Sequence, residues 1–593
     1  MAREIDFESI GSIAQAFRRT AREHADRLAV RSLDGELELT WGGLRERVDA
    51  LAGGLAELGL GRGDTMAIML SNRPEFHVVD LAAMMLGGVP FSVYQTLSPE
   101  QIAFVVADSG ARIAVIERAF LDSFSKAAQD LPSLEHVIVV DGEGEQGTLR
   151  LDEVERPGMD IDAAAAAIGA DDLLTLIYTS GTTGPPKGVE LTHGAMIATA
   201  EAFHDVIQFP DAARVISWLP SAHIAERAAH HYLPVIFGFS VTTCPDPRRI
   251  IEVLPQVRPH WFFAVPRIWE KIKAGLEARL ASLPEEQRSS ALAGLEAAKE
   301  KVRREQAGEP VPAELAEAVA AADEALFSKL RLMLGFDQAK AVTVGAAPTP
   351  PEVLEFFHAI GIPVGELWGM SETCGAGTTN PPGAARIGTV GPPVKGAEIR
   401  LADDGEILMR GPMLMRGYRN LPDKTRETIN EEGWLLTGDL GAFDEQGYLR
   451  IIDRKKEIII NAAGKNMSPA NIESTLKAAG PLLGQVCVIG DARPFNSALV
   501  VLDADYAPIW AEQQGLSERS LEALSREESV RAAIEAEIAQ ANEKLARVEQ
   551  VKKFVIVPGD WLPGGDELTP TMKLKRRPIA EKYGELIESM YTG

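Results

Sequence analysis

The fold is decided by residues 178–188, which read Tyr178-Thr179-Ser180-Gly181-Thr182-Thr183-Gly184-Pro185-Pro186-Lys187-Gly188. The apolar run 173–177 directly before this stretch is typical of a buried strand. Glycines let a backbone approach an anion closely, and backbone N–H groups with hydroxyls can surround phosphate oxygens. The stretch therefore predicts a phosphate-binding loop, although glycine-rich hydroxyl clusters in general are more often surface turns.

The spacing around Lys187 separates this loop from the Walker type. A Walker loop needs glycine before the lysine and serine or threonine after it, whereas here the neighbours are Pro186 and Gly188. This disfavours the P-loop NTPase folds.

Composition sets the broad class. The 593 residues are 46% hydrophobic and 25% charged, so we expect several folded lobes and little disorder. A formal net charge of -26 argues against DNA or RNA as the main partner, and any anionic ligand needs a local basic patch. Three scattered cysteines match no metal spacing and are expected to be buried in a protein of a reducing compartment.

The N-terminus, MAREIDFESIG, has no apolar signal region, and no apolar segment is long enough to span a bilayer. We therefore expect a cytoplasmic protein and leave peripheral membrane contact open.

Apolar runs alternate with helical patterns through the first two-thirds of the chain. Residues 65–70, 113–116 and 136–140 are typical of buried strands, and 44–58 of a helix, which together indicate a parallel or mixed sheet covered by helices. Residues of about 270–335 are rich in Ala, Glu, Lys and Arg at helical spacing. They predict a helical insertion with a solvated face, with partner binding as the less common alternative.

The pattern changes near residue 452. The charged break 453–456 is followed by strand patterns at 485–489 and 498–502 and a helical one at 527–545. These predict an N-terminal domain of residues 1–452 and a C-terminal domain of residues 453–593, with the boundary at Asp453.

Residues 178–188 closely resemble the phosphate loop of the adenylate-forming superfamily, which includes acyl-CoA synthetases, peptide-synthetase adenylation domains and beetle luciferases. Further segments match the family in chain order, and the match is closest to the long-chain and bubblegum-type fatty acyl-CoA synthetases. These segments are 345–348 (GAAP), 366–372 (ELWGMSE), 433–440 (GWLLTGDL), 448–456 (YLRIIDRKK), 459–469 (IINAAGKNMSP) and 567–577 (ELTPTMKLKRR).

The resemblance implies an α/β fold. A large N-terminal adenylate-forming domain would hold mixed sheets covered by helices plus a small β-rich lobe, and a smaller α+β C-terminal domain would be mobile. It also implies a two-step ligase. The enzyme would convert a fatty acid and ATP to acyl-AMP with Mg²⁺, and then transfer the acyl group to coenzyme A. A homodimer, common among long-chain relatives, is left open.

The resemblance also implies roles for individual residues. Lys573 is expected to bridge the fatty carboxylate and the α-phosphate, His223 to position the carboxylate, Glu372 and Thr179 to bind Mg²⁺, and Lys187 to neutralise phosphate charge. Asp453 is the implied hinge, and Gly464 and Lys465 are the implied coenzyme A contacts. The residues implied to bind ATP or AMP are Thr179, Ser180, Gly181, Thr182, Thr183, Gly184, Lys187, Gly345, Ala346, Ala347, Trp368, Gly369, Met370, Ser371, Asp439 and Arg454.

Several alternatives stay open at this level. A lone histidine such as His223 is more often a satisfied core or surface group, and a plain turn aspartate is the alternative for Asp453. Lys575, Arg576 and Arg577 fit a solvated face and the 3′-phosphate of coenzyme A equally well. Rival activities are an acyl-AMP ligase that loads a carrier protein in trans, luciferase-like oxygenation and a non-catalytic nucleotide-binding regulator.

Overall fold

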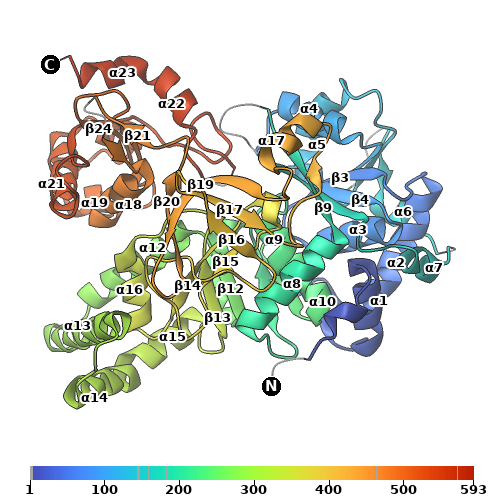
Figure 1. Ribbon diagram of the computed structural model, residues 1–593, viewed down its shortest axis with the longest axis horizontal. Coiled ribbons are helices and arrows are strands. Elements are labelled where there is room, and N and C mark those ends of the chain that lie inside the picture. Colours follow the sequence, from blue (N-terminus) through green and yellow to red (C-terminus); the bar gives the residue numbers. More distant parts are fainter. Residues whose placement is uncertain are drawn as a thin grey trace.

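The computed structural model describes residues 4–142, 147–157, 159–179, 185–462, 465–570 and 572–592. Figure 1 shows a large body and a smaller C-terminal group of elements that lies at one corner, beside β19 and β20. No helix of the described residues has both the length and the apolar character needed to cross a membrane.

The first sheet of the body is parallel throughout and has the order β4-β3-β5-β6-β7. Its strands are apolar and mostly buried on both faces, which is typical of parallel strands covered by helices. The strands are β3 (Thr65–Met69), β4 (Val89–Ser92), β5 (Ile113–Ile116), β6 (His136–Val139) and β7 (Leu149–Arg150), and helices nearby include α2 (Trp41–Glu57), α3 (Pro74–Met85), α4 (Pro99–Ser109) and α5 (Leu121–Ala128).

Local sequence signals set the ends of these helices. At the start of α4 the Ser98 hydroxyl accepts the N–H of Gln101 and the Gln101 side chain accepts the N–H of Ser98, with Pro99 in the first turn. The helix ends at Gly110, which adopts a left-handed conformation with φ of 76°.

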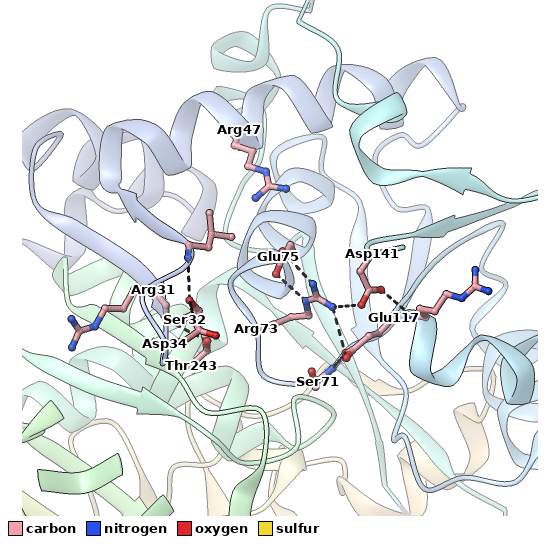
Figure 2. Close-up of polar contacts among 12 residues, drawn as sticks. Arg31, Ser32, Asp34, Arg47, Ser71, Arg73, Glu75, Glu117, Asp141 and Thr243 are labelled. Atoms are coloured by element: carbon pink, nitrogen blue, oxygen red, sulfur yellow. Dashed lines mark hydrogen bonds and ion pairs between the residues drawn. The ribbon is translucent and has the colours of Figure 1, made fainter. Parts of the chain in front are cut away.

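An ion cluster lies where three strands of this sheet end (Figure 2). Arg73, just before α3, contacts Glu75 at 2.9 Å, Asp141 at 3.0 Å and Glu117 at 3.7 Å, and Glu117 also accepts the N–H of Ser71 at 2.7 Å. Ser71, Glu117 and Asp141 follow β3, β5 and β6, so the cluster fixes the carboxyl edge of the sheet where the strand order reverses.

Two further sheets of the body are mixed. One has the order β10-β11-β1-β2 and the other β12-β13-β14-β15, each with one antiparallel edge strand. Their strands are β1 (Leu28–Ser32), β2 (Glu38–Thr40), β10 (Arg214–Ser217), β11 (Ser240–Thr243), β12 (Trp261–Ala264), β13 (Ala341–Val344), β14 (Val364–Trp368) and β15 (Thr378–Thr379).

Helices occupy most of the segment between β12 and β13, where Figure 1 shows α13 and α14 at the lower edge of the molecule. The helices of this segment are α12 (Pro266–Ala281), α13 (Glu285–Ala307), α14 (Ala313–Ala322) and α15 (Ser328–Leu334), and α16 (Pro351–Ala359) follows β13.

A small β-rich lobe of antiparallel strands in the order β16-β17-β19-β20 follows. Its strands are β16 (Glu398–Leu401), β17 (Glu406–Arg410), β19 (Leu435–Phe443) and β20 (Leu449–Arg454). Asp453 therefore lies inside β20, where it pairs with Leu440.

The residues after β20 bury a core of their own. Their two apolar clusters run from Ile459 to Met590 and contain no residue of the body. The main elements are α18 (Pro469–Ala479), β23 (Leu483–Ile489), β24 (Asn496–Leu502), α19 (Ala507–Gln513), α21 (Glu528–Lys544), β25 (Val551–Ile556), α22 (Arg576–Lys582) and α23 (Gly584–Ser589). The observed architecture confirms the expected fold class: a large α/β body, a β-rich lobe and a smaller α+β C-terminal part.

Candidate active site

A β-hairpin places two of the predicted residues opposite each other. Strand β8 (Leu173–Thr179) ends at Thr179 and β9 (Lys187–Thr192) begins at Lys187, and these two residues are partners in the antiparallel register. The expected phosphate contacts Ser180, Gly181, Thr182, Thr183 and Gly184 lie in the connecting loop, outside the described residues.

Lys187 and Glu372 gather around Tyr418, a residue that the sequence motifs did not single out. The Tyr418 hydroxyl donates to Glu372 Oε1 at 2.7 Å, and Lys187 Nζ lies 4.2 Å from the centre of the Tyr418 ring. Burial lowers the pKa of Lys187, and the nearby Glu372 carboxylate acts in the opposite direction. Tyr418 lies on β18 (Gly417–Tyr418), which pairs with β9, so its role depends on long-range packing.

Gly345, Ala346 and Ala347 form a turn directly after β13. A Cβ on Gly345 would meet Leu367 Cδ1 at 3.0 Å, and Ala346 adopts a left-handed φ of 69° that is uncommon for alanine. Ala347 is exposed. A flat base could therefore lie against this small-residue backbone.

Glu366 on the neighbouring strand β14 is a second site residue without a sequence-based role. Its carboxyl accepts the N–H of Gly388 at 3.2 Å, and burial raises its pKa to about 8. At neutral pH this group is therefore largely protonated and able to donate a hydrogen bond.

The segment Gly369-Met370-Ser371 connects β14 to Glu372 and depends on close backbone packing. A Cβ on Gly369 would lie 2.4 Å from the carbonyl oxygen of Gly375, so no larger residue fits there. The N–H of Met370 donates to Thr373 Oγ1 at 3.0 Å, and Ser371 opens a single 3₁₀ turn that carries Glu372.

Trp368, Asp439 and Arg454 form a connected group. The Trp368 indole donates to Asp439 Oδ2 at 2.8 Å, and Arg454 Nε contacts Asp439 Oδ1 at 2.6 Å. Asp439 is buried in β19, and Arg454 is its partner in β20. Trp368, Asp439 and Arg454 are all residues expected to bind ATP or AMP, which stays a prediction, while the observed contact of Trp368 orients the Asp439 carboxylate.

His223 lies in a loop closed by buried polar groups. Glu226 Oε2 accepts the N–H of Leu219 at 3.0 Å, and Asn72 donates to Leu219 O at 2.8 Å. His223 Nδ1 accepts the N–H of Ala225, so a neutral ring carries its proton on Nε2. Burial and the charge of Lys573 lower the pKa of His223 to about 4, which makes it a neutral donor at physiological pH.

Lys573 reaches this group from the C-terminal part of the chain. A tight turn holds it, in which its N–H donates to Thr569 Oγ1 at 3.0 Å and Met572 takes a left-handed φ of 65°. The side chain keeps contact with solvent, yet the surrounding protein lowers its pKa. Arg454 acts in the same direction, whereas the carboxylates Asp439 and Glu372 oppose it, so these groups share one electrostatic environment.

The predicted hinge residue Asp453 directly precedes Arg454 of this group in β20. The buried Asp453 carboxylate accepts the Ser468 hydroxyl at 2.5 Å, which ties β20 to the start of α18. Lys465 is exposed, and Gly464 lies outside the described residues. Of the basic residues near the C-terminus, Arg576 is occupied by Glu473 at 2.6 Å and Glu457 at 3.0 Å, whereas Arg577 is exposed.

The cluster has residues suited to each part of a nucleotide. Two lysines and a neutral histidine could contact phosphate, and carboxylates could receive a metal and a ribose. Glu372 and Thr179 offer the oxygen donors that Mg²⁺ prefers, and Tyr418 engages only one carboxylate oxygen of Glu372 among the described contacts. The donor set therefore fits a magnesium ion shared with phosphate oxygens.

A fold and a site of this kind define an enzyme that binds adenylate. Residues 17–419 match the family of AMP-binding enzymes, and residues 456–593 match the AMP-binding enzyme C-terminal domain. The chain belongs to this family, as its resemblance predicted.

Named relatives indicate which members of the family this chain resembles. The chain is 49% identical to "Putative fatty-acid--CoA ligase fadD11" of Mycobacterium tuberculosis over 73% of this chain and 76% of that protein. It is 34% identical to the long-chain-fatty-acid–CoA ligase FadD15 of the same organism, over 95% of this chain and 94% of the relative. It is 32% identical to the long-chain-fatty-acid–CoA ligase ACSBG2 of Xenopus laevis, over 98% of this chain and 84% of that protein.

Solved structures agree on the fold. The anthranilate CoA ligase AuaEII superposes with a TM-score of 0.75 at 19% identity, over 99% of this chain and 100% of the other. The o-succinylbenzoate coenzyme A synthetase of Bacillus subtilis with ATP and magnesium gives 0.68 at 22% identity, over 95% and 98%. At these identities the likeness establishes the fold alone.

Proposed function

We propose that this protein is a long-chain fatty acid–CoA ligase that forms acyl-AMP and then acyl-CoA. The observation that carries the proposal is electrostatic: the charges of Glu372 and Asp439 act on Lys573 of the C-terminal part, and the charge of Lys573 acts on His223 of the body. Relatives named long-chain-fatty-acid–CoA ligases over nearly the whole chain support the substrate class.

In the first step, a carboxylate oxygen of the fatty acid attacks the α-phosphorus of ATP and pyrophosphate leaves. Lys573 would bridge the two reacting groups, because an ammonium stabilises the charge that builds on the α-phosphate. Lys187 would neutralise the other phosphates, and His223 would donate through Nε2 to a carboxylate oxygen. A magnesium ion held by Glu372 and Thr179 would supply further charge neutralisation.

In the nucleotide pocket, Asp439 would accept the ribose hydroxyls while Trp368 and Arg454 keep its carboxylate in place. The turn at residues 345–347 would lie along the adenine. The second step attaches the thiolate sulfur of coenzyme A to the acyl carbon and releases AMP, and Lys465 and Gly464 are the proposed contacts for that substrate.

We propose further that the chain divides at Asp453 and that residues 453–593 rotate between the two steps. Asp453 fits this role because its backbone belongs to β20 of the body and its side chain binds Ser468 of α18.

The test measures AMP formation from Mg·ATP across a series of fatty-acid lengths, with and without coenzyme A, and identifies products by mass. We expect coenzyme A-dependent release of AMP with an acyl-CoA product and a maximum among long chains. Accumulation of acyl-AMP that ignores coenzyme A would instead indicate loading of a carrier protein, and absence of acyl-AMP would overturn the proposal.

A further inference from the structure

Among the residues that the structure describes, three ion pairs connect the C-terminal part to helices of the body, away from the candidate site. Arg267 on α12 pairs with Asp503, Lys271 on α12 pairs with Asp505, and Lys544 at the end of α21 contacts Glu352 on α16 at 2.7 Å. Figure 1 shows α12 and α16 below α18 and α19. We call the two α12 pairs the latch.

The two basic residues of the latch are spaced for a joint role. Arg267 and Lys271 are four residues apart on α12, so their side chains lie on one face of the helix, one turn apart. Their partners are also neighbours, since Asp503 and Asp505 follow directly after β24. Two charged contacts therefore fix how α12 and the segment after β24 align with each other.

Asp503 is a fixed partner for Arg267. It is buried, and its Oδ1 accepts the N–H groups of Asp505 at 3.0 Å and Tyr506 at 2.8 Å, while its own N–H donates to Leu482 O at 2.9 Å. A carboxylate held by backbone groups at the start of α19 gives the C-terminal part a definite docking point.

Lys573 belongs to the C-terminal part, which is joined covalently to the body only through β20. A covalent joint fixes one point and leaves rotation about it free, so contacts distant from the joint must set the angle. We propose that Arg267 and Lys271 are positioning residues that hold the C-terminal domain in the orientation in which Lys573 meets the reacting groups. This inference rests on the proposed function.

The latch is built to open. The side chains of Lys271 and Asp505 are 41% and 72% exposed, so water and salt compete with their pairing. Arg267 and the buried Asp503 set the docking point, while the weak, solvated Lys271–Asp505 pair lets the latch release, and so permits the rotation needed for thioester formation.

The first test separates the two half-reactions. In the variant Lys271→Glu we expect acyl-AMP formation in a single turnover to slow about three- to ten-fold, because charge reversal removes an exposed ion pair and adds a repulsion of similar size. The conversion of supplied acyl-AMP and coenzyme A to acyl-CoA should stay unchanged or rise. The matched control is Lys273→Glu on the same helix, because Lys273 pairs with Glu277 of α12 itself at 2.8 Å.

Charge reversal on the partner provides a rescue. The pair Lys271→Glu with Asp505→Lys should restore acyl-AMP formation to within about two-fold of the wild type, because the attraction is recreated with opposite polarity. Equal slowing of both half-reactions in Lys271→Glu, or no rescue by the swapped pair, would overturn the latch.

A cross-link gives an independent test. The native cysteines Cys244, Cys374 and Cys487 are buried, so Lys271→Cys with Asp505→Cys can be joined selectively by a short bis-maleimide. The joined protein should form acyl-AMP but lose acyl-CoA formation, whereas the unjoined double variant should still form acyl-CoA and form acyl-AMP more slowly than the joined protein. Full acyl-CoA formation by the joined protein would refute the proposal. Failure of the wild type to form acyl-AMP would instead refute the proposed function.

Discussion

The two parts that build the candidate site are held in place by opposite means. In the body, Tyr418 donates a hydrogen bond to Glu372, and the loop that carries His223 is held by hydrogen bonds of the buried Glu226 and Asn72 with the backbone of Leu219. The C-terminal part brings Lys573 on a short turn, and its contacts with α12 and α16 are ion pairs. Lys271, Asp505 and Lys544 are at least 41% exposed in these pairs, whereas Asp503, the partner of Arg267, is buried. His223 and Glu372 are thus held in place, whereas Lys573 belongs to a part of the chain that can move away. This suits a site that serves two reactions in turn.

The largest expected effect comes from breaking a buried ion pair of the body. Arg227 and Asp80 form an ion pair with both side chains fully buried, joined by Tyr232 and His231. Arg227→Met leaves the buried Asp80 carboxylate without its guanidinium partner, so we expect a loss of about 3–5 kcal/mol in the free energy of unfolding, measured by urea denaturation.

A surface pair is the control for that change. Arg112 and Glu135 contact each other at 2.6 Å with side chains 44% and 47% exposed, so Arg112→Met should cost less than about 1 kcal/mol. Equal losses in the two variants would contradict the view that the body is organised by buried polar contacts.

The next largest effect is expected at Lys573 of the C-terminal part. Lys573→Ala should slow acyl-AMP formation by about 10²–10³-fold, because a charge aimed at the developing transition state is lost. Thioester formation from supplied acyl-AMP should be nearly unchanged, as measured by quenched-flow assays. Arg577→Ala is the control, since Arg577 is exposed and pairs with Glu581 of its own helix at 2.8 Å. A loss confined to the second half-reaction would assign Lys573 a different role.

Much of the fold could be predicted because it depends on local signals. The apolar runs 65–70, 113–116 and 136–140 correspond to β3, β5 and β6, and the helix expected at 527–545 is α21. Their hydrophobic period and the residues that end them are properties of each segment alone.

The site was only partly predictable, because several of its contacts join distant segments. Tyr418 meets Glu372 across 46 residues and Trp368 meets Asp439 across 71, and neither contact leaves a pattern in one stretch of sequence. Glu366 belongs to the motif at residues 366–372, but its raised pKa arises from burial that only the folded sheet creates. Arg267 and Asp503 are ordinary surface charges until α12 meets the C-terminal part.

Glu366 yields a smaller effect that depends on pH. Burial raises its pKa from an ordinary 4.5 to about 8, so between these values the folded state keeps a proton that the unfolded state releases. Its contribution to stability is complete below pH 4.5 and is lost as pH rises toward 8. We expect Glu366→Gln to remove about 3 kcal/mol of this decline between pH 5 and pH 7.5, measured by thermal unfolding. A parallel pH profile for variant and wild type would exclude a proton held at Glu366.

The smallest effect concerns Tyr418, whose hydroxyl and ring contribute separately. Tyr418→Phe keeps the ring beside Lys187 but removes the hydrogen bond to Glu372, which should cost about 1 kcal/mol of metal–nucleotide binding. Calorimetric titration with Mg·ATP should show an affinity about five-fold weaker, while binding of ATP without metal changes little. Tyr448→Phe is the control, because its hydroxyl donates at 3.0 Å to Ala384 O, which is not among the site residues. If the variant weakens ATP binding equally with and without Mg²⁺, then Tyr418 acts on the phosphates through Lys187, and the fixed half of the site is organised around the lysine instead of the carboxylate.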